Sequence, residues 1–307
     1  MQLLDGKVVA NKVKDELKEA IKKTKDLNKT ASLFLGGDMS PLIVPELAVI
    51  QVGDNQASST YVKSKQKACE YVGIRSTVYN LDEDVNDDYV INLIKSLNHN
   101  KNVDGILVQL PLPKHLDENK ILLHIDPSKD VDGFHESNVG KFNLGNKDAF
   151  IPCTPLGIQY ILKYYNIDVA GKECVVVGRS NIVGKPMANL LLQMDGTVTV
   201  AHSKTSNLKE VCKRADILIC AIGKPKFFDK DYIKDGAVVI DVGINRDENG
   251  KLCGDVDFDD VKDIVSAITP VPGGCGPMTV AMLMYNVIAA KQRNMAVKYK
   301  NLREGMA

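Results

Sequence analysis

The chain carries no excess of charge of either sign. Lys plus Arg and Asp plus Glu number 39 each, so no overall field would draw it to nucleic acid or to a membrane surface. It also lacks an apolar run long enough to span a bilayer, and residues 1–5 do not resemble the start of a secretory signal. We therefore expect neither nucleic acid nor a membrane among its partners.

Paired cysteines are absent as well. The seven cysteines are scattered over 307 residues without a C-x-x-C pair, and the five histidines are equally dispersed. This distribution argues against a disulfide framework and against a zinc site, so we expect reduced thiols, no bound metal and a cytoplasmic location. With 44% hydrophobic and 25% charged residues and no internal repeats, the composition is that of a globular chain long enough for two domains.

The N-terminal half alternates between helical and extended patterns. Residues 11–23 predict an amphipathic helix, because Val13, Leu17 and Ile21 recur on one face. Strands are expected at residues 47–52, 76–81 and 105–110, with helices at 57–71 and through Val90, Ile94 and Leu97. Strands separated by helices predict a parallel sheet covered on both faces. Residues 33–45 interrupt the alternation and are expected to form a surface loop.

The segment 178–186, GRSNIVGKP, separates a buried strand at 174–177 from a helix. A glycine turn between a strand and a helix N-terminus is where an α/β fold binds the phosphates of a dinucleotide. The spacing is not the usual G-x-G-x-x-G, because Ser180 replaces the second glycine and Arg179 brings a cation into the turn. The cofactor-binding residues predicted in this turn are Gly178, Arg179, Ser180 and Gly184.

More strands follow this turn in the nucleotide-binding part of the chain, at residues 198–201, 217–221 and 237–242. The first of them ends at His202 and Ser203, where an NAD-specific site would carry Asp or Glu for the ribose 2′-hydroxyl. Because that carboxylate is missing and Arg179 is close in the fold, the expected cofactor is NADP. We place His202, Ser203 and Ile244 in its site; the alternative is that Ser203 and Lys204 belong to a solvated loop.

A candidate catalytic pair lies on the helix at 57–71. Tyr61 and Lys65 share the stripe that should be buried, and their i, i+4 spacing brings the side chains within reach of each other. A lysine in apolar surroundings is suited to proton transfer near neutral pH; the alternative is that Lys65 extends its ammonium group to water at the edge of the stripe. Tyr-x-x-x-Lys is also the catalytic pair of short-chain dehydrogenases, but there it follows the glycine turn, whereas here it precedes Gly178.

Further polar groups accompany the strand at 105–110. Gln109 lies at its carboxyl end, where ligands bind in open α/β sheets; the alternative is that it caps backbone groups there. Asp130 and Asp132 flank one valine, so in an extended segment only one of them should face a ligand. That carboxylate could accept two hydrogen bonds from an aminopyrimidinone edge, and the alternative for either aspartate is a role in a helix cap or turn.

Six segments in register resemble the bifunctional methylenetetrahydrofolate dehydrogenase/methenyltetrahydrofolate cyclohydrolase family over almost the whole chain. They are SSTYVKSK at 58–65, VQLPLP at 108–113, KDVDG at 129–133, PCTP at 152–155, GRSNIVGKP at 178–186 and PGGCGPMT at 272–279. The extended segment 33–45 is the one departure from the family, and it lies ahead of all six motifs.

The resemblance implies one cleft between two domains, with folate bound by the first domain and NADP by the second. Lys65 matches the catalytic lysine of the family, Tyr61 its folate-contacting tyrosine and Gln109 the glutamine that positions the lysine. The other positions carried over are Asp132 for the pterin, Ser58, Pro272 and Gly276 for the folate site, and Arg179 and Ser203 for the 2′-phosphate. The resemblance thus implies that Lys65, Tyr61, Gln109 and Asp132 form the catalytic set.

The expected fold is α/β with two domains. Residues 1–150 form the folate-binding catalytic domain, which the C-terminal helix at 278–307 completes by returning to it. Residues 151–277 form a Rossmann-like NADP-binding domain. The family also implies a homodimer, and the lack of a formate-ligase extension implies that the third activity of some larger relatives is missing.

The activity implied by the resemblance has two steps. The enzyme oxidises 5,10-methylenetetrahydrofolate with NADP and hydrolyses the methenyl product to 10-formyltetrahydrofolate. The first step leaves a cation stabilised by both folate nitrogens and needs orientation more than a base, whereas the second needs proton transfer, which we assign to Lys65. The alternatives are another two-domain NADP dehydrogenase of shikimate type and a non-enzymatic nucleotide-sensing module.

Overall fold

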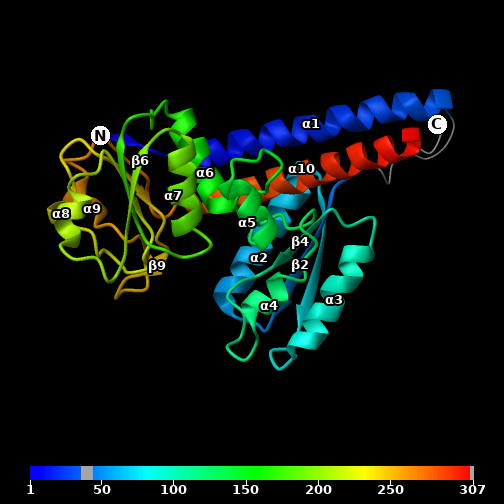
Figure 1. The fold of residues 1–307 in the computed structure, drawn as a ribbon, viewed down its shortest axis with the longest axis horizontal. Helices are drawn as coiled ribbons and strands as arrows, with labels where there is room; N and C mark the ends of the chain where they lie inside the picture. Colours follow the sequence, from blue (N-terminus) through cyan, green and yellow to red (C-terminus); the bar gives the residue numbers. More distant parts are fainter. Residues whose placement is uncertain (36–43, 305–307) are drawn as a thin grey trace. The chain divides into compact units, whose positions relative to one another are not determined.

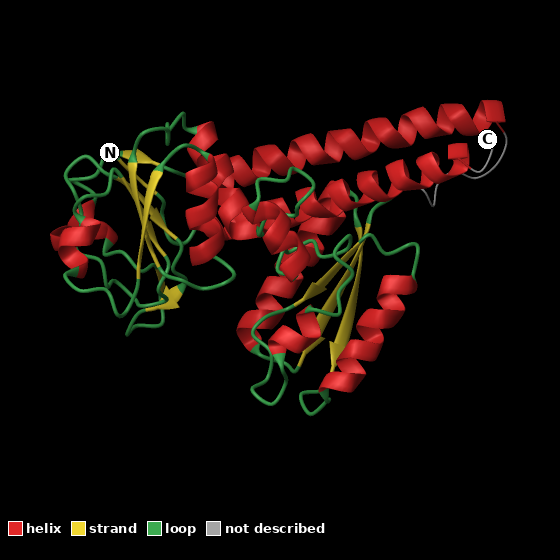
Figure 2. Cartoon of the chain, viewed as in Figure 1, coloured by secondary structure: helices red, strands yellow, loops and turns green. Residues whose placement is uncertain are grey.

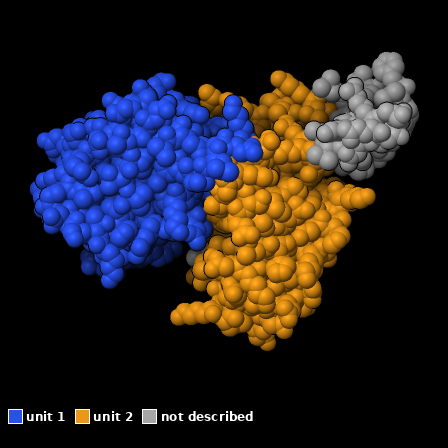
Figure 3. Space-filling model, viewed as in Figure 1, with its two compact units in different colours: residues 1–11, 143–147, 151–282 blue, residues 12–142, 148–150, 283–307 orange. Residues whose placement is uncertain are grey.

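The computed structural model describes residues 1–35 and 44–304, without the side chains of 25, 27–35, 57 and 296–304. Most of the expected surface loop, at 36–43, therefore lies outside the described residues. The chain divides into two compact units (Figure 3). Unit 1 comprises residues 1–11, 143–147 and 151–282, and unit 2 comprises residues 12–142, 148–150 and 283–307.

Unit 1 contains a six-stranded sheet with the order β1-β11-β8-β7-β5-β6, in which every pairing is parallel. Figure 1 labels its edge strand β6. The strands are β1 (Gln2–Leu3), β5 (Glu173–Val177), β6 (Thr197–Ala201), β7 (Ile217–Cys220), β8 (Val238–Asp241) and β11 (Ala267–Ile268). At the carboxyl edge of this sheet, Val177 lies opposite both Ala201 and Cys220. The central strands are continuous apolar runs because both of their faces are buried.

Helices and a small hairpin surround this sheet. They are α6 (Cys153–Tyr164), α7 (Gly184–Gln193), α8 (Leu208–Cys212), the 3-10 helix η2 (Lys230–Tyr232), α9 (Phe258–Val261), and the antiparallel strands β9 (Asn245–Arg246) and β10 (Leu252–Cys253). On one face of the sheet, Val175, Leu218 and Val239 pack with α8, α9 and the buried ring of Phe228. The alternate residues of β5 are also buried, and α7 contacts β5 and β6.

The first residues of the chain belong to unit 1. Gln2 pairs with Ala267 and Leu3 with Ile268, so β1 extends the six-stranded sheet at its edge. The sequence-based division placed residues 1–11 with the folate-binding domain, whereas in the structure these residues belong to the same compact unit as residues 151–282. A two-residue strand carries no periodicity of its own, and its partner lies at the other end of the chain.

Unit 2 contains a parallel three-stranded sheet with the order β3-β2-β4. Its elements are β2 (Glu46–Val52), α2 (Gln56–Val72), β3 (Arg75–Leu81), α3 (Asp87–His99), β4 (Gly105–Val108), α4 (Glu118–Leu122) and α5 (Glu136–Asn143). Figure 2 shows α2 and α3 on either side of the strands. Ile50 and Ile106 of the sheet pack with Ile94 of α3 and Ile121 of α4, which confirms the predicted helix-covered parallel sheet.

Two long helices have residues in both units: α1 (Gly6–Leu35) and α10 (Cys275–Glu304). From Leu283 onward, α10 belongs to unit 2, where Asn286 Nδ2 donates to the Val131 carbonyl oxygen at 2.8 Å. The last helix therefore returns to the first domain, as predicted. The first helix is longer than the predicted 11–23 at both ends. Within the described residues, no helix is both long enough and apolar enough to cross a membrane.

Candidate active site

Lys65 lies on the buried side of α2, with 9% of its surface exposed. Its Nζ donates to Gln109 Oε1 at 2.9 Å, and Gln109 is itself 9% exposed. Gln109 Nε2 in turn donates to the Leu110 carbonyl oxygen at 2.7 Å. The glutamine thus has both of the roles considered from the sequence, because it caps the backbone beyond β4 and also holds the lysine. The alternative in which the Lys65 ammonium group extends to water does not occur in this structure.

Tyr61 lies one turn before Lys65 on α2 and is more accessible, with 36% of its surface exposed. Partial burial raises the pKa of its phenol, so the hydroxyl stays protonated at neutral pH and can donate a hydrogen bond. Ser58, at the start of the same helix, is buried. The three predicted residues of α2 therefore follow one another along the helix from its N-terminal turn.

Gln51 was not predicted, although it supports the start of α2. It is buried near the carboxyl end of β2, and its Nε2 donates to Ser59 Oγ at 2.9 Å and to the Gly53 carbonyl oxygen at 3.1 Å. This amide ties the turn after the strand to the first turn of the helix that carries Lys65. An amide in an otherwise apolar strand was the signal that identified Gln109, and the same signal applies to Gln51.

The two aspartates after β4 have different surroundings. Asp130 is buried, and its carboxylate accepts hydrogen bonds from Phe134 N at 3.2 Å, His135 N at 2.9 Å and Asn138 Nδ2 at 2.8 Å. Its burial raises the pKa of this carboxyl group. Asp132 is only half-buried. Asp130 therefore has the turn role, and Asp132 is the more accessible carboxylate of the pair.

Asp132 lies in a turn that follows an isolated bridge to β4. Asp130 forms this parallel bridge with Ile106, and Gly133 N then donates to the Asp130 carbonyl oxygen at 3.2 Å. The carboxyl ends of β2 and β4 lie at one edge of the sheet, and α2 begins just beyond β2. This is the edge at which open α/β sheets bind ligands.

The glycine turn of unit 1 connects β5 to α7. Gly178 has a φ of +137°, and a Cβ atom there would clash with the Ala221 carbonyl oxygen. A Cβ on Gly184 would clash with the backbone of Gly178, so both glycines are required for this tight turn. Ser180 Oγ accepts hydrogen bonds from Val183 N at 3.2 Å and Gly184 N at 3.3 Å, so this hydroxyl caps the start of α7.

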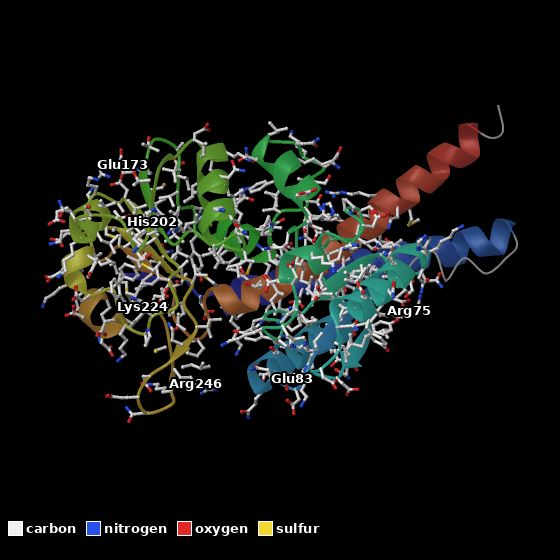
Figure 4. The ribbon with its side chains drawn as sticks, turned by 60° about the horizontal axis from the view of Figure 1, so that its bottom comes forward. Arg75, Glu83, Glu173, His202, Lys224 and Arg246 are labelled. Carbon is white, nitrogen blue, oxygen red and sulfur yellow. The ribbon has the colours of Figure 1, made fainter. Side chains whose placement is uncertain are left out.

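Arg179 and Ser203 occupy equivalent positions just beyond two neighbouring strands. Val177 of β5 pairs with Ala201 of β6, and each of the two predicted residues lies two positions beyond its strand's paired end. Both side chains are exposed. His202 Nδ1 accepts a hydrogen bond from Lys204 N at 3.1 Å, which orders the turn after β6 (His202 is labelled in Figure 4).

The start of α10 brings a predicted folate residue next to a predicted cofactor residue. A Cβ on Gly276, the second residue of α10, would lie 3.7 Å from Ile244 Cδ1, and Ile244 itself is exposed. Pro272, in the turn before this helix, is also exposed. Gly273 in this turn has a φ of +114°, and its carbonyl oxygen accepts a hydrogen bond from Lys7 N at 2.9 Å. Unit 1 therefore places Gly276 and Ile244 together at the carboxyl end of β8.

This edge of unit 1 suits a dinucleotide. The backbone at Gly178 and Gly184 can approach a pyrophosphate closely because neither residue has a side chain, and the ten-residue helix α7 directs its N-terminus toward the turn. Exposed Arg179 adds a positive charge there. Among the residues with described side chains, no group of three or more His, Cys, Asp or Glu residues could hold a metal ion.

Two family models match the chain. Residues 4–132 match the catalytic domain of tetrahydrofolate dehydrogenase/cyclohydrolase, and residues 152–295 match the NAD(P)-binding domain of the same family. The bifunctional protein FolD of Lachnoclostridium phytofermentans is 57% identical over 286 residues, which cover 93% of this chain and 96% of that protein.

Solved structures resemble the chain over a similar length. The crystal structure of the bifunctional enzyme FolD, a methylenetetrahydrofolate dehydrogenase/cyclohydrolase from Campylobacter jejuni, has a TM-score of 0.88 and 50% identity, covering 95% of this chain and 99% of that one. The Trypanosoma brucei enzyme complexed with NADP cofactor and inhibitor has a TM-score of 0.86 and 34% identity, covering 95% and 98%. The chain therefore belongs to the tetrahydrofolate dehydrogenase/cyclohydrolase family.

Proposed function

We propose that this enzyme oxidises 5,10-methylenetetrahydrofolate to 5,10-methenyltetrahydrofolate with NADP and then hydrolyses the product to 10-formyltetrahydrofolate. Its membership of the family supports both activities, and its likeness to the Trypanosoma brucei enzyme complexed with NADP supports the choice of cofactor. A shikimate-type dehydrogenase and a nucleotide-sensing module are not favoured, because both parts of the chain match the folate family.

The observation that carries the proposal is the buried 2.9 Å hydrogen bond from Lys65 Nζ to Gln109 Oε1. In the hydrolysis, water adds to the methenyl carbon and gives up one proton. The hydroxyl proton then passes to N5 as the bond between N5 and the carbon breaks, so that one proton is released overall. We assign these proton transfers to Lys65, oriented by Gln109, with Tyr61 against the folate.

We assign the orientation of the substrate to the other predicted residues. The Asp132 carboxylate can accept two hydrogen bonds from the amino edge of the pterin. We place Ser58, Pro272 and Gly276 in the remainder of the folate site. In the oxidation step the bound cofactor supplies the hydride acceptor, so the protein's contribution to this step is to hold the methylene carbon in a reactive orientation.

The cofactor residues form a second set, in unit 1. The backbone at Gly178 and Gly184 and the N-terminus of α7 would bind the pyrophosphate. Arg179 and Ser203, just beyond adjacent strands, would bind the 2′-phosphate. His202 orders the turn after β6 by accepting the hydrogen bond from Lys204 N. Ser180 shapes the turn, and Ile244 would contact the nicotinamide half.

One coupled assay tests the proposed function. Methylenetetrahydrofolate is supplied with NADP or with NAD, and NADPH formation and methenyl decay are followed in the same sample. We expect NADPH to form first and the methenyl signal to rise and then decay faster than it does without enzyme. Absence of folate-dependent reduction with either cofactor would refute the proposal, and reduction without methenyl decay would refute the hydrolase half.

We also infer a homodimer, and the position of β3 supports it. β3 is an edge strand of the unit 2 sheet, and within the described chain its outer side pairs with no other strand. Such an edge exposes a row of backbone donors and acceptors that a second copy can pair with. Its ends are marked in Figure 4 by Arg75 and by Glu83 just beyond it. Sedimentation equilibrium should give twice the 33.6 kDa chain mass, and a monomer would contradict the inference.

A further inference from the structure

Two buried carboxylates lie at the carboxyl edge of the unit 1 sheet. Asp241 is the last residue of β8 and is 4% exposed, and Asp255 follows β10 and is completely buried. Neither residue belongs to a motif identified from the sequence, and neither has a part in the function proposed above. A buried carboxylate is costly unless hydrogen-bond donors surround it, so their surroundings indicate what they stabilise.

The carboxylate of Asp255 accepts four hydrogen bonds. Its Oδ2 accepts from Ile222 N at 2.6 Å and Gly223 N at 3.0 Å, and its Oδ1 accepts from Lys224 N at 2.8 Å and Asn245 Nδ2 at 2.9 Å. Three of these donors are consecutive backbone N–H groups of the loop after β7. The fourth belongs to the start of the β9–β10 hairpin, which follows β8. One side chain thus fixes two loops.

Asp241 holds Asp255 in place. Its Oδ1 accepts hydrogen bonds from Asp255 N and Gly243 N, both at 2.9 Å, and its Oδ2 accepts from Val256 N at 2.9 Å. A Cβ atom on Gly243 would clash with the Asp255 carboxylate, and one on Gly254 would clash with the Asp241 carboxylate. The backbone therefore packs directly against both acids, and the arrangement has little room to adjust.

Both loops adjoin the predicted cofactor residues. The first loop continues from Ala221, whose carbonyl oxygen leaves no room for a side chain on Gly178 of the phosphate turn. The second begins at Asn245, immediately after Ile244, which lies beside Gly276. Lys224 and Arg246, labelled in Figure 4, mark the two loops. They lie at the carboxyl ends of β7 and β8, where the half of a dinucleotide beyond the pyrophosphate is bound.

We propose that Asp255 is a positioning residue for the dinucleotide: its carboxylate holds the loops after β7 and β8 in the conformation that receives the cofactor. The proposal rests on the NADP site proposed above. An aspartate is needed because each carboxylate oxygen accepts two N–H donors. In Asp255→Asn, an NH₂ group replaces one of the two carboxylate oxygens. Whichever oxygen it replaces, it faces two N–H donors, so the loops must move.

The test compares Asp255→Asn with the wild type in two measurements. Titration calorimetry gives the Kd for NADP, and hydrogen exchange of the cofactor-free protein gives the protection of the backbone amides at 222–224. We expect the Kd to rise about tenfold or more, because a buried donor without a partner costs about 1.4 kcal/mol or more, equivalent to that factor. We also expect faster exchange at 222–224 than in the wild type.

The matched control is Asp216→Asn, immediately before β7 at the opposite edge of the same sheet. The Asp216 carboxylate accepts a hydrogen bond from Glu173 N at 3.0 Å and pairs with Lys234 Nζ at 2.7 Å. It is therefore also an aspartate that holds backbone, but it is remote from the carboxyl edge. The control should change the NADP Kd by less than about twofold, a factor that corresponds to roughly 0.4 kcal/mol.

Other results separate the possible failures. A wild type that does not bind NADP would refute the proposed function rather than this inference. If the wild type binds NADP and Asp255→Asn binds it with the same Kd, the inference is overturned. It is also overturned if Asp255→Asn loses methenyl hydrolysis to the same extent as it loses NADP affinity. If Asp255→Asn does not fold, Asn245→Ala is the test variant, because it removes one of the four donors and leaves Asp255 in place. An unchanged NADP Kd and unchanged hydrogen exchange at 222–224 in Asn245→Ala would overturn the inference.

Discussion

The partner of Lys65 determines what this residue can do. A lysine beside a carboxylate is held charged by the ion pair, whereas the Gln109 amide oxygen is neutral and accepts a hydrogen bond from either an ammonium or an amine group. The same amide is fixed by its bond to the Leu110 carbonyl oxygen, so its acceptor stays directed at the lysine. This arrangement is compatible with the proton transfers that we propose for Lys65.

We predict that Lys65→Met lowers methenyl hydrolysis by about 10²- to 10⁴-fold, the usual contribution of a general acid or base. Folate affinity should change much less, because methionine keeps the apolar length of the side chain. The measurement is the rate of methenyl decay at saturating substrate, together with the folate Kd. Lys63→Met, on the exposed side of the same helix, is the control and should keep the native rate. A native rate in Lys65→Met would refute the assignment.

Arg179 should select between the two dinucleotides. We predict that Arg179→Ala raises the KM for NADP about tenfold, because a charge-assisted hydrogen bond to the 2′-phosphate is lost, and leaves the KM for NAD nearly unchanged. Initial rates with each cofactor test this prediction. Lys185→Ala serves as the control, since the Lys185 Nζ is bonded to Asn181 Oδ1 at 2.8 Å within the same turn. Equal losses with NADP and NAD would show that Arg179 does not recognise the 2′-phosphate.

Among the elements, α10 connects the segment at 130–133 to the sheet of unit 2. Asn286 on this helix binds the Val131 carbonyl oxygen, next to Asp132, and Lys291 forms a buried ion pair with Asp104 at 3.3 Å. Burial raises the pKa of Asp104, and the nearby Lys291 opposes this rise. A Cβ atom added at Gly105 would clash with the Val131 side chain, so β4 and this segment are in direct contact. Asn286 and Lys291 thus stabilise the backbone that carries Asp132, although neither residue belongs to a sequence motif.

We predict that Asn286→Leu raises the KM for methylenetetrahydrofolate several-fold and has a smaller effect on kcat. The variant removes the hydrogen bond from Asn286 to the Val131 carbonyl oxygen, at a cost of about 1–3 kcal/mol, and allows the segment before Asp132 to shift. Steady-state kinetics and thermal unfolding are the measurements. Gln292→Leu, which is exposed on the same helix, should match the wild type in both. An unchanged KM in a destabilised Asn286→Leu protein would limit Asn286 to a structural role.

On the scale of the whole molecule, buried acids make stability depend on pH. Burial raises the pKa of Asp241 to about 7 from 3.8, and it also raises the pKa of Asp130 and Asp104. A carboxyl group with a raised pKa binds its proton more tightly in the folded state than in the unfolded state. Its contribution to stability is therefore fully present below pH 3.8 and is lost as the pH rises through about 7.

We predict that the free energy of unfolding of unit 1 falls between pH 5 and pH 8 by on the order of 2–3 kcal/mol from Asp241 alone. Asp241→Asn, which does not titrate, should show a smaller fall. Urea denaturation at the two pH values, in wild type and variant, gives the comparison. Identical pH slopes in the two proteins would show that Asp241 does not titrate in this range.

The periodicity of the sequence was sufficient to predict most elements of the fold. Apolar runs such as 174–177 and 217–220 became central strands, and the stripe on α2 correctly placed Lys65 on the buried side. Local pattern carried no signal for β1, which has two residues and pairs with residues 267–268. Residues 1–11 join unit 1 through that pairing and through other long-range contacts, such as the hydrogen bond from Lys7 N to the Gly273 carbonyl oxygen.

The sequence by itself determined the order of strands and helices, the glycine turn and the residue types at the carboxyl edges, because these follow from periodicity and backbone sterics within short segments. Only the tertiary structure decided which partner each buried polar group has. Lys65 and Gln109 are separated by 44 positions, and Asn286 and Val131 by 155. Local pattern shows that a side chain is buried, but its hydrogen-bond partners come from distant parts of the chain, which only the packing of the sheet brings within 3 Å.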